Sequence, residues 1–200
     1  MIEINKLVNA EPYDLFKSFY DQALSKNQNN IEACAISSFS HNDKEVNSRF
    51  VNLKYIIDNN WIFFSNYKSA KSSQFISHNQ VSALFFWNTI NVQIRIKGLI
   101  YKCNKDFSDK HFLGRSKEKN ALAISSNQSR QINSYDSVVS KYNMTLNKNG
   151  KLNKVRPDYW GGYYFIPYYF EFWEGHNSRL NKRDVYEIQG SKWDHFILQP

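Results

Sequence analysis

The stretch Glu171-Phe172-Trp173-Glu174-Gly175-His176-Asn177-Ser178-Arg179-Leu180-Asn181-Lys182-Arg183 combines an aromatic pair, a glycine turn and two arginines near the C-terminus. Trp173 offers a large apolar surface for a flat ligand, whereas Arg179 and Arg183 carry planar guanidinium groups that pair with phosphate or carboxylate. Taken alone, the pattern also fits a strand that ends in a solvated loop, because arginines four residues apart are common on protein surfaces. The choice between a ligand site and a plain loop therefore depends on the rest of the chain.

Four upstream blocks have a similar character, with basic, aromatic and amide side chains on or beside strand-like runs. They are Ser48-Arg49-Phe50-Val51-Asn52-Leu53-Lys54, Phe63-Phe64-Ser65-Asn66-Tyr67-Lys68-Ser69-Ala70-Lys71-Ser72, Trp87–Gly98 and Asn127-Gln128-Ser129. In order and spacing, from Arg49 to Pro200, the five blocks resemble the pyridoxine (pyridoxamine) 5'-phosphate oxidase family. The resemblance implies a flavin-binding split β-barrel, a homodimer and FMN as cofactor. It also implies oxidation of pyridoxamine or pyridoxine 5'-phosphate by dioxygen, which yields pyridoxal 5'-phosphate and hydrogen peroxide.

Length and composition describe one globular domain. The chain has 200 residues, of which 42% are hydrophobic and 16% aromatic, and this is enough to bury a sizeable core. No run reaches the roughly 18 apolar residues of a membrane-spanning helix, and the N-terminus lacks a basic region followed by an apolar core. We therefore expect a soluble, cytoplasmic protein with one domain over residues 1–200. Residues 1–30 should form a helical segment and, by the resemblance, 157–200 the dimerisation and active-site strands.

Several other classes of protein are disfavoured. The net charge of +8 invites a nucleic-acid partner, but Lys and Arg are scattered without a basic stripe or an RNA-binding signature. A positive field that attracts small phosphorylated ligands explains the charge equally well. Cys34 and Cys103 form neither a disulfide framework nor a metal motif, so we expect buried, reduced thiols. The five histidines are dispersed and no Gly-x-Ser-x-Gly occurs, which argues against a metal site and a serine hydrolase.

Hydrophobic periodicity predicts an α+β fold in which short strands form a small barrel with helices outside it. An amphipathic helix is expected over Pro12–Asn27, with Leu15, Phe16, Phe19, Tyr20, Ala23 and Leu24 on its buried stripe. Further helices are expected at Ser69–His78, Phe107–Arg115, Lys117–Ser125 and about Ser134–Asn147, and a lysine-rich loop at Lys148–Arg156. Strands are expected at Ala33–Ser40, Asn47–Ile57, Trp61–Ser65, Val81–Trp87, Asn91–Lys102, Tyr163–Trp173, Asp184–Gln189 and Lys192–Leu198. In Asn47–Ile57, alternation places Arg49, Val51, Leu53, Tyr55 and Ile57 on one face.

A phosphate of the cofactor would have to be held by side chains. The chain has seven glycines and neither a Gly-x-Gly-x-x-Gly nor a P-loop pattern, so no glycine-rich cradle exists. Without the resemblance, the basic residues of these strands would be ordinary solvent-facing positions. The resemblance assigns FMN contacts to Arg49, Phe50, Val51, Asn52, Leu53, Lys54, Phe64, Ser65, Lys71, Gln93, Gln128, Ser129, Trp173 and Arg183. It places Gln128, Ser129, Trp173 and Arg183 opposite the phosphate-binding strand of a partner subunit.

The substrate side of the resemblance is less regular. It implies that Lys54, His111, Arg115, Lys119 and Arg179 meet the substrate, with Arg115 on its phosphate and Arg179 on its ring, and that Arg179 and Asn181 occupy the catalytic positions. The chain departs from the family pattern where His111 replaces a tyrosine, Lys119 a serine, Asn181 a histidine and Ala70 an arginine. The N-terminal arm also lacks an Arg-Arg-x-Tyr lid segment. His111 and Lys119 can still donate hydrogen bonds to a phosphate, whereas Asn181 cannot titrate near neutral pH as histidine does.

These departures leave other functions open. One is a relative that keeps the flavin site but oxidises another substrate, such as the phenazine-tailoring oxidases. Another is a flavin-binding or basic nucleic-acid-binding protein without turnover. In the oxidase hypothesis the chemistry belongs to the flavin and the protein supplies position and electrostatics, which explains why no other catalytic constellation appears.

Overall fold

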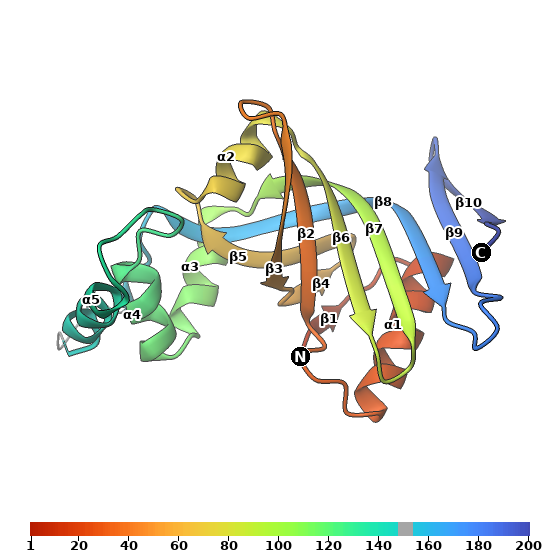
Figure 1. Cartoon of the computed structure of the whole chain (residues 1–200), viewed down its shortest axis with the longest axis horizontal. Helices are drawn as coiled ribbons and strands as arrows, with labels where there is room; N and C mark the ends of the chain where they lie inside the picture. Colours follow the sequence, from red (N-terminus) through yellow and green to blue (C-terminus); the bar gives the residue numbers. More distant parts are fainter. Residues whose placement is uncertain (148–153) are drawn as a thin grey trace.

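The computed structural model describes residues 1–147 and 154–200, which form one strongly curved sheet with helices around it (Figure 1). The helices are α1 (Glu11–Ser25), α2 (Ala70–Ser77), α3 (Lys105–Leu113), α4 (Lys117–Ser125) and α5 (Tyr135–Asn147). The strands are β1 (Glu3–Asn5), β2 (Ala33–Ser40), β3 (Glu45–Asn52), β4 (Tyr55–Ile57), β5 (Asn60–Asn66), β6 (Gln80–Trp87), β7 (Val92–Lys102), β8 (Trp160–Glu174), β9 (Lys182–Gln189) and β10 (Lys192–Ile197). The expected α+β composition is confirmed.

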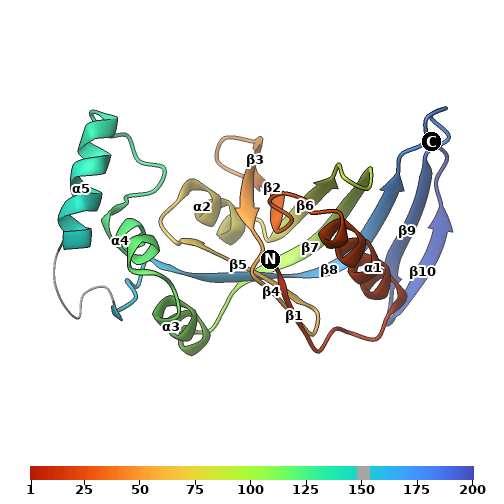
Figure 2. The same ribbon diagram turned by 90° about the horizontal axis from the view of Figure 1, so that it is seen from below.

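Strand β8 organises the sheet. The strand order is β1-β4-β5-β8-β7-β6-β2-β3, with β9 also paired to β8 and β10 to β9. Both views show β8 running through the molecule, from the end that carries α3, α4 and α5 to the end that carries β9 and β10 (Figures 1 and 2). One edge of β8 pairs with β7 along Tyr163–Glu174. The other edge is divided between β5, at Trp160–Phe165, and β9, at Tyr169–Glu174.

Pro167 lies at the point where β8 changes neighbours. A proline has no backbone N–H, so inside a sheet it is tolerated at edges and irregularities. In register, Pro167 faces Gly98, and the pairing of β7 with β8 shifts between Lys97 and Gly98. A Cβ added to Gly98 would lie 2.8 Å from the carbonyl oxygen of Ile166. The glycine thus permits the close approach of the two backbones at this irregularity, and the sheet splits there.

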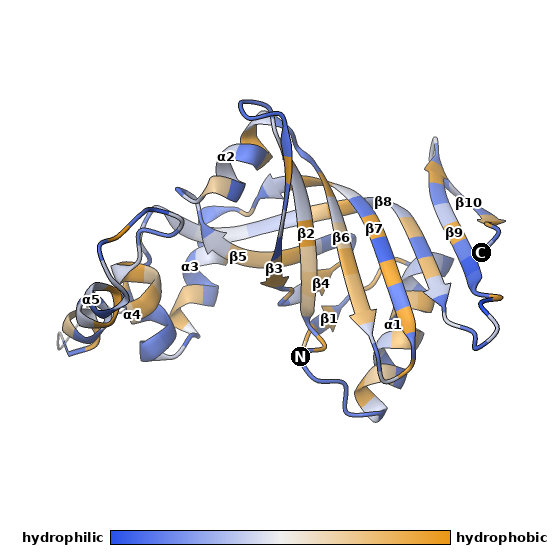
Figure 3. Cartoon of the chain, in the orientation of Figure 1, coloured by the Kyte–Doolittle hydropathy of each residue, from blue (hydrophilic) through white to orange (hydrophobic). Residues whose placement is uncertain are grey.

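The core forms between α1 and the concave side of the sheet. Strand β7 alternates apolar and polar residues over Val92–Lys97 (Figure 3), and its buried residues include Val92, Ile94 and Ile96. On α1, Phe16, Phe19, Tyr20 and Ala23 are buried as expected from their spacing. The stripe extends toward the N-terminus rather than the C-terminus. Tyr13 is buried, whereas Leu24 is 40% exposed.

Most predicted elements agree with the structure to within a few residues, but two local predictions are wrong. The three-residue strand β1, which pairs in parallel with β4, was not expected. Residues 47–57 form two strands, because the chain leaves β2 and joins β5: Leu53 N–H donates to Glu32 O (2.8 Å) and Lys54 N–H to Ile62 O (2.7 Å). The alternation changes phase there, so Ile56 is buried instead of Tyr55 and Ile57. The expected loop 148–156 lies mostly outside the described residues.

Both cysteines are free thiols, Cys34 buried in β2 and Cys103 partly buried just after β7. Burial raises the pKa of each thiol to about 12. Over the described ranges, every helix is too short or too polar to cross a bilayer.

Phe16 should be a main source of stability. Its ring is fully buried and contacts Trp61, Trp87 and Phe85 at centroid distances of 4.5, 5.5 and 5.7 Å. We expect Phe16→Ala to lower the free energy of unfolding by about 3–5 kcal/mol, measured by chemical denaturation. The matched control on the same helix is Leu24→Ala, which should lower it by less than about 1 kcal/mol. Similar losses for the two variants would show that α1 does not pack as described.

Candidate functional site

Most predicted site residues converge on one cavity. It has a volume of about 330 Å³ and lies where β3 and β5 meet α2, α3 and α4. Its lining consists of Phe50, Val51, Asn52, Lys54, Phe64, Ser65, Lys71, His111, Arg115, Lys119, Gln128 and Trp160. Every one of these except Trp160 was predicted as a cofactor or substrate residue. We call it the anion cavity because its charged side chains are all basic.

Lys71 and Arg49 form the deep basic part of this region. Lys71, in the first turn of α2, is 8% exposed and its Nζ donates to Ser65 Oγ (3.1 Å) and Ser69 Oγ (3.3 Å). Arg49 donates from Nη1 to Ser38 Oγ (2.6 Å) and from Nη2 to Gln74 Oε1 (2.8 Å). Neutral hydroxyl and amide oxygens therefore hold both cations.

No carboxylate forms an ion pair with Lys71 or Arg49 within residues 1–147 and 154–200. Burial, together with the charge of Arg49, lowers the pKa of Lys71 to about 8. Burial also lowers the pKa of Arg49. A buried cation without a counter-ion is unfavourable. The arrangement is therefore suited to an anion that enters from outside the chain, such as a phosphate.

Arg115 forms a second basic centre in the same cavity. Its guanidinium lies over the Trp160 ring, 4.2 Å from the centroid, and Nη2 donates to Lys119 O (3.0 Å). Its Nη1 is buried and has no hydrogen-bond partner in the part of the chain that the structure describes. Burial lowers the pKa of Arg115 to about 10. An unsatisfied buried donor costs about 1–3 kcal/mol, which an anionic ligand would recover.

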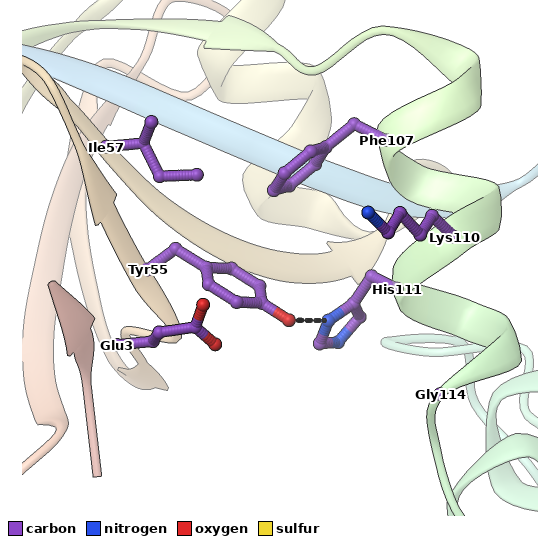
Figure 4. A pocket seen from close by; sticks show the side chains of 7 residues that line it. All are labelled: Glu3, Tyr55, Ile57, Phe107, Lys110, His111 and Gly114. Atoms are coloured by element: carbon purple, nitrogen blue, oxygen red, sulfur yellow. Dashed lines mark hydrogen bonds between the residues drawn. The ribbon is translucent and has the colours of Figure 1, made fainter. Parts of the chain in front are cut away.

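His111 forms the wall between the anion cavity and a second cavity. The second cavity has a volume of about 410 Å³ and is lined by Glu3, Tyr55, Ile57, Phe107, Lys110, His111 and Gly114 (Figure 4). The His111 ring stacks on Phe64 with centroids 3.6 Å apart and planes at 9°. Tyr55 Oη lies 2.8 Å from His111 Nδ1. Burial, and then the charges of Arg115, Lys54 and Lys119, lower the pKa of His111 to about 4.

Three other predicted cofactor residues form a row at the opposite end of the sheet. Gln93 of β7 pairs with Trp173 of β8, and Trp173 pairs with Arg183 of β9. Glu171, which is 2% exposed, accepts hydrogen bonds from Arg183 Nε (2.9 Å) and Nη2 (2.7 Å) and from Arg95 Nη1 (2.8 Å). The buried carboxylate therefore fixes the direction of the Arg183 side chain.

The two predicted catalytic residues lie in the loop between β8 and β9. Arg179 is exposed and has a φ of +60°, in the left-handed region that a non-glycine residue adopts only when its surroundings hold it there. Its N–H donates to His176 O (2.9 Å), and His176 N–H donates to Asn181 Oδ1 (3.0 Å). Asn181 therefore closes the loop that presents Arg179.

The residues of the anion cavity and the row of Gln93, Trp173 and Arg183 cannot meet within one chain. Trp160 lines the anion cavity and Trp173 lies in the row with Gln93, and a strand advances about 3.3 Å per residue. The two tryptophans are therefore roughly 40 Å apart along β8. Figures 1 and 2 show the two ends of β8 on opposite sides of the molecule.

The structure corrects the expected position of Gln128. Gln128 lies in the anion cavity of its own chain, with Oε1 3.4 Å from Ser65 Oγ, rather than across a subunit boundary. Leu53 is fully buried in the core, so only its backbone could meet a ligand. Ser129, with a φ of +68°, lines a separate cavity of about 230 Å³.

Several relatives of this chain carry the same name. A protein from Cytophaga hutchinsonii named pyridoxine/pyridoxamine 5'-phosphate oxidase is 37% identical over 98% of this chain and 91% of its own length. The chain belongs to the pyridoxine/pyridoxamine 5'-phosphate oxidase family. A relative of the same name from Legionella pneumophila is 35% identical over 95% of this chain and 88% of its own length. Residues 160–200 match the family described as the pyridoxine 5'-phosphate oxidase C-terminal dimerisation region. The chain is thus an oxidoreductase of this family.

Solved structures confirm the fold. PhzG from Burkholderia lata 383, solved with tetrahydrophenazine-1-carboxylic acid, has a TM-score of 0.87 and 27% identity, covering 96% of this chain and 93% of PhzG. A pyridoxamine 5'-phosphate oxidase-related, FMN binding protein from Nostoc punctiforme has a TM-score of 0.75 and 11% identity, covering 92% of this chain and 97% of its own. The predicted FMN-binding split β-barrel is therefore confirmed as the fold class.

The sequence prediction missed several residues that shape this site. Trp160 supports Arg115, Tyr55 contacts His111, and Ser38 and Gln74 hold Arg49. Trp160 precedes two glycines at the start of a long aromatic run, and Tyr55 directly follows Lys54. The place of these two residues in the sequence could therefore have identified them as candidates for the site. Ser38 and Gln74 carry no comparable signal, because their role depends on a contact between β2 and α2.

Proposed function

We propose that this protein is an FMN-dependent oxidase that converts pyridoxamine or pyridoxine 5'-phosphate to pyridoxal 5'-phosphate, with dioxygen as oxidant and hydrogen peroxide as second product. The observation that carries the proposal is the anion cavity, where buried cations lack carboxylate partners in the described chain. Membership of the family supports the substrate and the cofactor.

The donor set fits the phosphate of FMN. Lys71 and Arg49 would supply the positive charge, and Ser65 and Gln128 would supply neutral hydrogen-bonding groups beside it. Side chains at the row of Gln93, Trp173 and Arg183 offer an amide, a flat apolar ring and a guanidinium to the rest of the cofactor. When bound, FMN would accept the hydride equivalent from the substrate and pass the electrons to dioxygen.

Arg115 would hold the phosphate of the substrate. Its unpartnered Nη1 is a donor already desolvated in the free protein, and its stacking on Trp160 keeps the guanidinium plane fixed. Lys54, whose Nζ is 3.6 Å from Glu32 Oε1, and the exposed Lys119 add charge around it. These side chains bind and orient the substrate so that binding geometry, rather than proton transfer by the protein, lowers the barrier.

Arg179 would lie over the substrate ring, because a guanidinium is planar and can stack on a π-system. Asn181 would act on the reaction through the loop, since its side chain holds His176 and thereby the backbone of Arg179. As an amide, Asn181 moves no proton near neutral pH. The protein therefore positions the ring without a titrating group at this place.

A complete site would need a homodimer. The row at one end of β8 and the anion cavity at its other end would come together only if a second copy placed its row over the first copy's cavity. A two-fold axis would then create two equivalent sites. The match of residues 160–200 to a dimerisation region supports this arrangement.

A second candidate is an oxidase of this family with a different substrate. The high structural similarity to PhzG supports this candidate. The departures from the family pattern at His111, Lys119 and Asn181 support it too. The two candidates share the FMN site and differ at the substrate.

The function is tested by turnover. We expect FMN-loaded protein to convert pyridoxamine 5'-phosphate to pyridoxal 5'-phosphate with release of hydrogen peroxide. Arg115→Met should raise KM about 10- to 100-fold with a smaller change in kcat, because a charge-assisted contact contributes about 1.5–3 kcal/mol. Lys117→Met, which removes an exposed cation from α4, is the control and should leave both constants unchanged. If neither pyridoxamine nor pyridoxine 5'-phosphate is oxidised while FMN stays bound, the candidate with a different substrate replaces this one.

The cofactor assignment is tested by comparing FMN with riboflavin, which lacks the phosphate. Lys71→Met should weaken FMN binding by about 10- to 100-fold and riboflavin binding little. Between about pH 7 and pH 8 native FMN affinity should change little, because the phosphate is then a dianion. It should fall above pH 8, since burial lowers the pKa of Lys71 to about 8 and the free protein loses this charge there. Titration calorimetry and flavin fluorescence measure both effects. The exposed Lys68 provides the control, and equal losses for FMN and riboflavin would remove Lys71 from the phosphate site.

The shared site is tested by mixing two inactive variants. Co-refolded Lys71→Met and Arg183→Met subunits should recover about one quarter of native high-affinity FMN binding, because half the dimers would be mixed and each would contain one intact site. Mixing Lys71→Met with Arg49→Met should recover nothing, since both changes lie in the same half of the site. Recovery in neither mixture, despite mixed dimers seen by mass spectrometry, would show that one chain supplies the whole site.

A further inference from the structure

Tyr55 in the lining of the second cavity contacts His111, which lines both cavities. Tyr55 Oη is 2.8 Å from His111 Nδ1, and Figure 4 shows the two side chains facing each other from β4 and α3. Phe107 packs edge-on against Tyr55 with centroids 5.6 Å apart. Phe64 lies flat against His111, as described above. Both rings are therefore held in place on two sides.

The direction of this hydrogen bond follows from the available partners. A phenolic O–H is a good donor and a neutral imidazole nitrogen a good acceptor. Within the described ranges, Tyr55 Oη has His111 Nδ1 as its hydrogen-bond partner and no other. If His111 donated instead, the Tyr55 O–H would have no acceptor among the described residues and would have to donate to solvent in the second cavity. We therefore take Tyr55 as the donor, which leaves the proton of the neutral imidazole on Nε2.

The charges around His111 keep the ring neutral. Lys54, Arg115 and Lys119 act on it from the anion cavity, and Lys110 lies beside it in the second cavity. Glu3 is the acidic residue among the described lining, and it stands on the far side of Tyr55 (Figure 4). The lowered pKa of about 4 agrees with this arrangement. In the described chain, Nε2 of this neutral ring has no hydrogen-bond partner.

We propose that Tyr55 is a positioning residue that fixes His111 as the Nε2–H tautomer, so that His111 donates a neutral hydrogen bond to the phosphate of the substrate. The proposal rests on the proposed function, because it requires a phosphorylated substrate beside Arg115. His111 would then replace the tyrosine hydroxyl of the family pattern with a donor whose direction Tyr55 sets. Specificity for a phosphate would thus depend on a residue that need not touch the substrate itself.

The tautomer is tested without cofactor or substrate. In protein labelled with 15N-histidine, the His111 signals, assigned by their loss in His111→Gln, should show a protonated Nε2 and an unprotonated Nδ1 from pH 5.5 to pH 8. Tyr55→Phe should shift the Nδ1 signal by removing its hydrogen bond. Added inorganic phosphate should shift the Nε2–H signal in native protein. A proton on Nδ1, or an Nε2–H that does not respond to phosphate, would overturn the proposal.

A double-mutant comparison tests the effect on the substrate. Tyr55→Phe should raise KM for pyridoxamine 5'-phosphate roughly two- to tenfold and leave kcat nearly unchanged. In a His111→Gln background the same change should have no effect, because the glutamine amide donates without help from Tyr55. Tyr135→Phe removes the hydroxyl of a tyrosine that is 79% exposed and serves as control.

The outcomes separate this inference from the proposed function. An equal effect of Tyr55→Phe in both backgrounds would mean that Tyr55 acts through packing alone, and would overturn the inference while turnover stands. Absence of turnover in native protein would overturn the proposed function. In that case the phosphate titration by NMR still decides whether His111 is the donor that Tyr55 positions.

Discussion

The divided edge of β8 is the constraint on which the rest of the structure depends. A strand has two hydrogen-bonding edges, and β7 occupies one of them for most of the length of β8. The other edge serves β5 before Pro167 and β9 after it. Because proline cannot donate to a ladder, the change of neighbour falls where a hydrogen bond would be missing in any case. The barrel part of the sheet and the C-terminal hairpin are thus separate units on one continuous strand.

The basic cavity next to this strand is unfavourable for the free protein and useful for a ligand. Folding places Lys71, Arg49 and Arg115 in surroundings that disfavour charge, and neutral oxygens satisfy them only in part. The hydrophobic core has to offset the free-energy cost of desolvating these cations. The aromatic cluster around Trp61 and Phe16, packed under α1, supplies apolar burial. Val51 belongs to both regions, because it lines the cavity and packs against this core.

Local pattern predicted much of this fold and a large part of the cavity. The limits of β2 and α4 agree with the expected ones, because alternation and a serine cap are encoded in neighbouring residues. The break between β3 and β4 was missed, because the chain exchanges one partner strand for another there and the burial alternation changes phase with the partner. The burial of Lys71 and the place of Gln128 beside Ser65 also depend on contacts between distant segments. Family resemblance supplied the residue types, but the chain's own contacts, such as that of Tyr55 with His111, required the structure.

Strand β8 has one more consequence if the protein acts as a dimer. Each copy would then contribute the cavity to one site and the tryptophan row to the other, and a single stretch of hydrogen-bonded backbone would connect them. Trp173 of one site would then lie on the same strand as Trp160, which supports Arg115 in the other. One continuous strand would connect the two sites through the interior of each subunit. Any coupling between the sites would act equally in both directions, because linkage between two ligands is reciprocal.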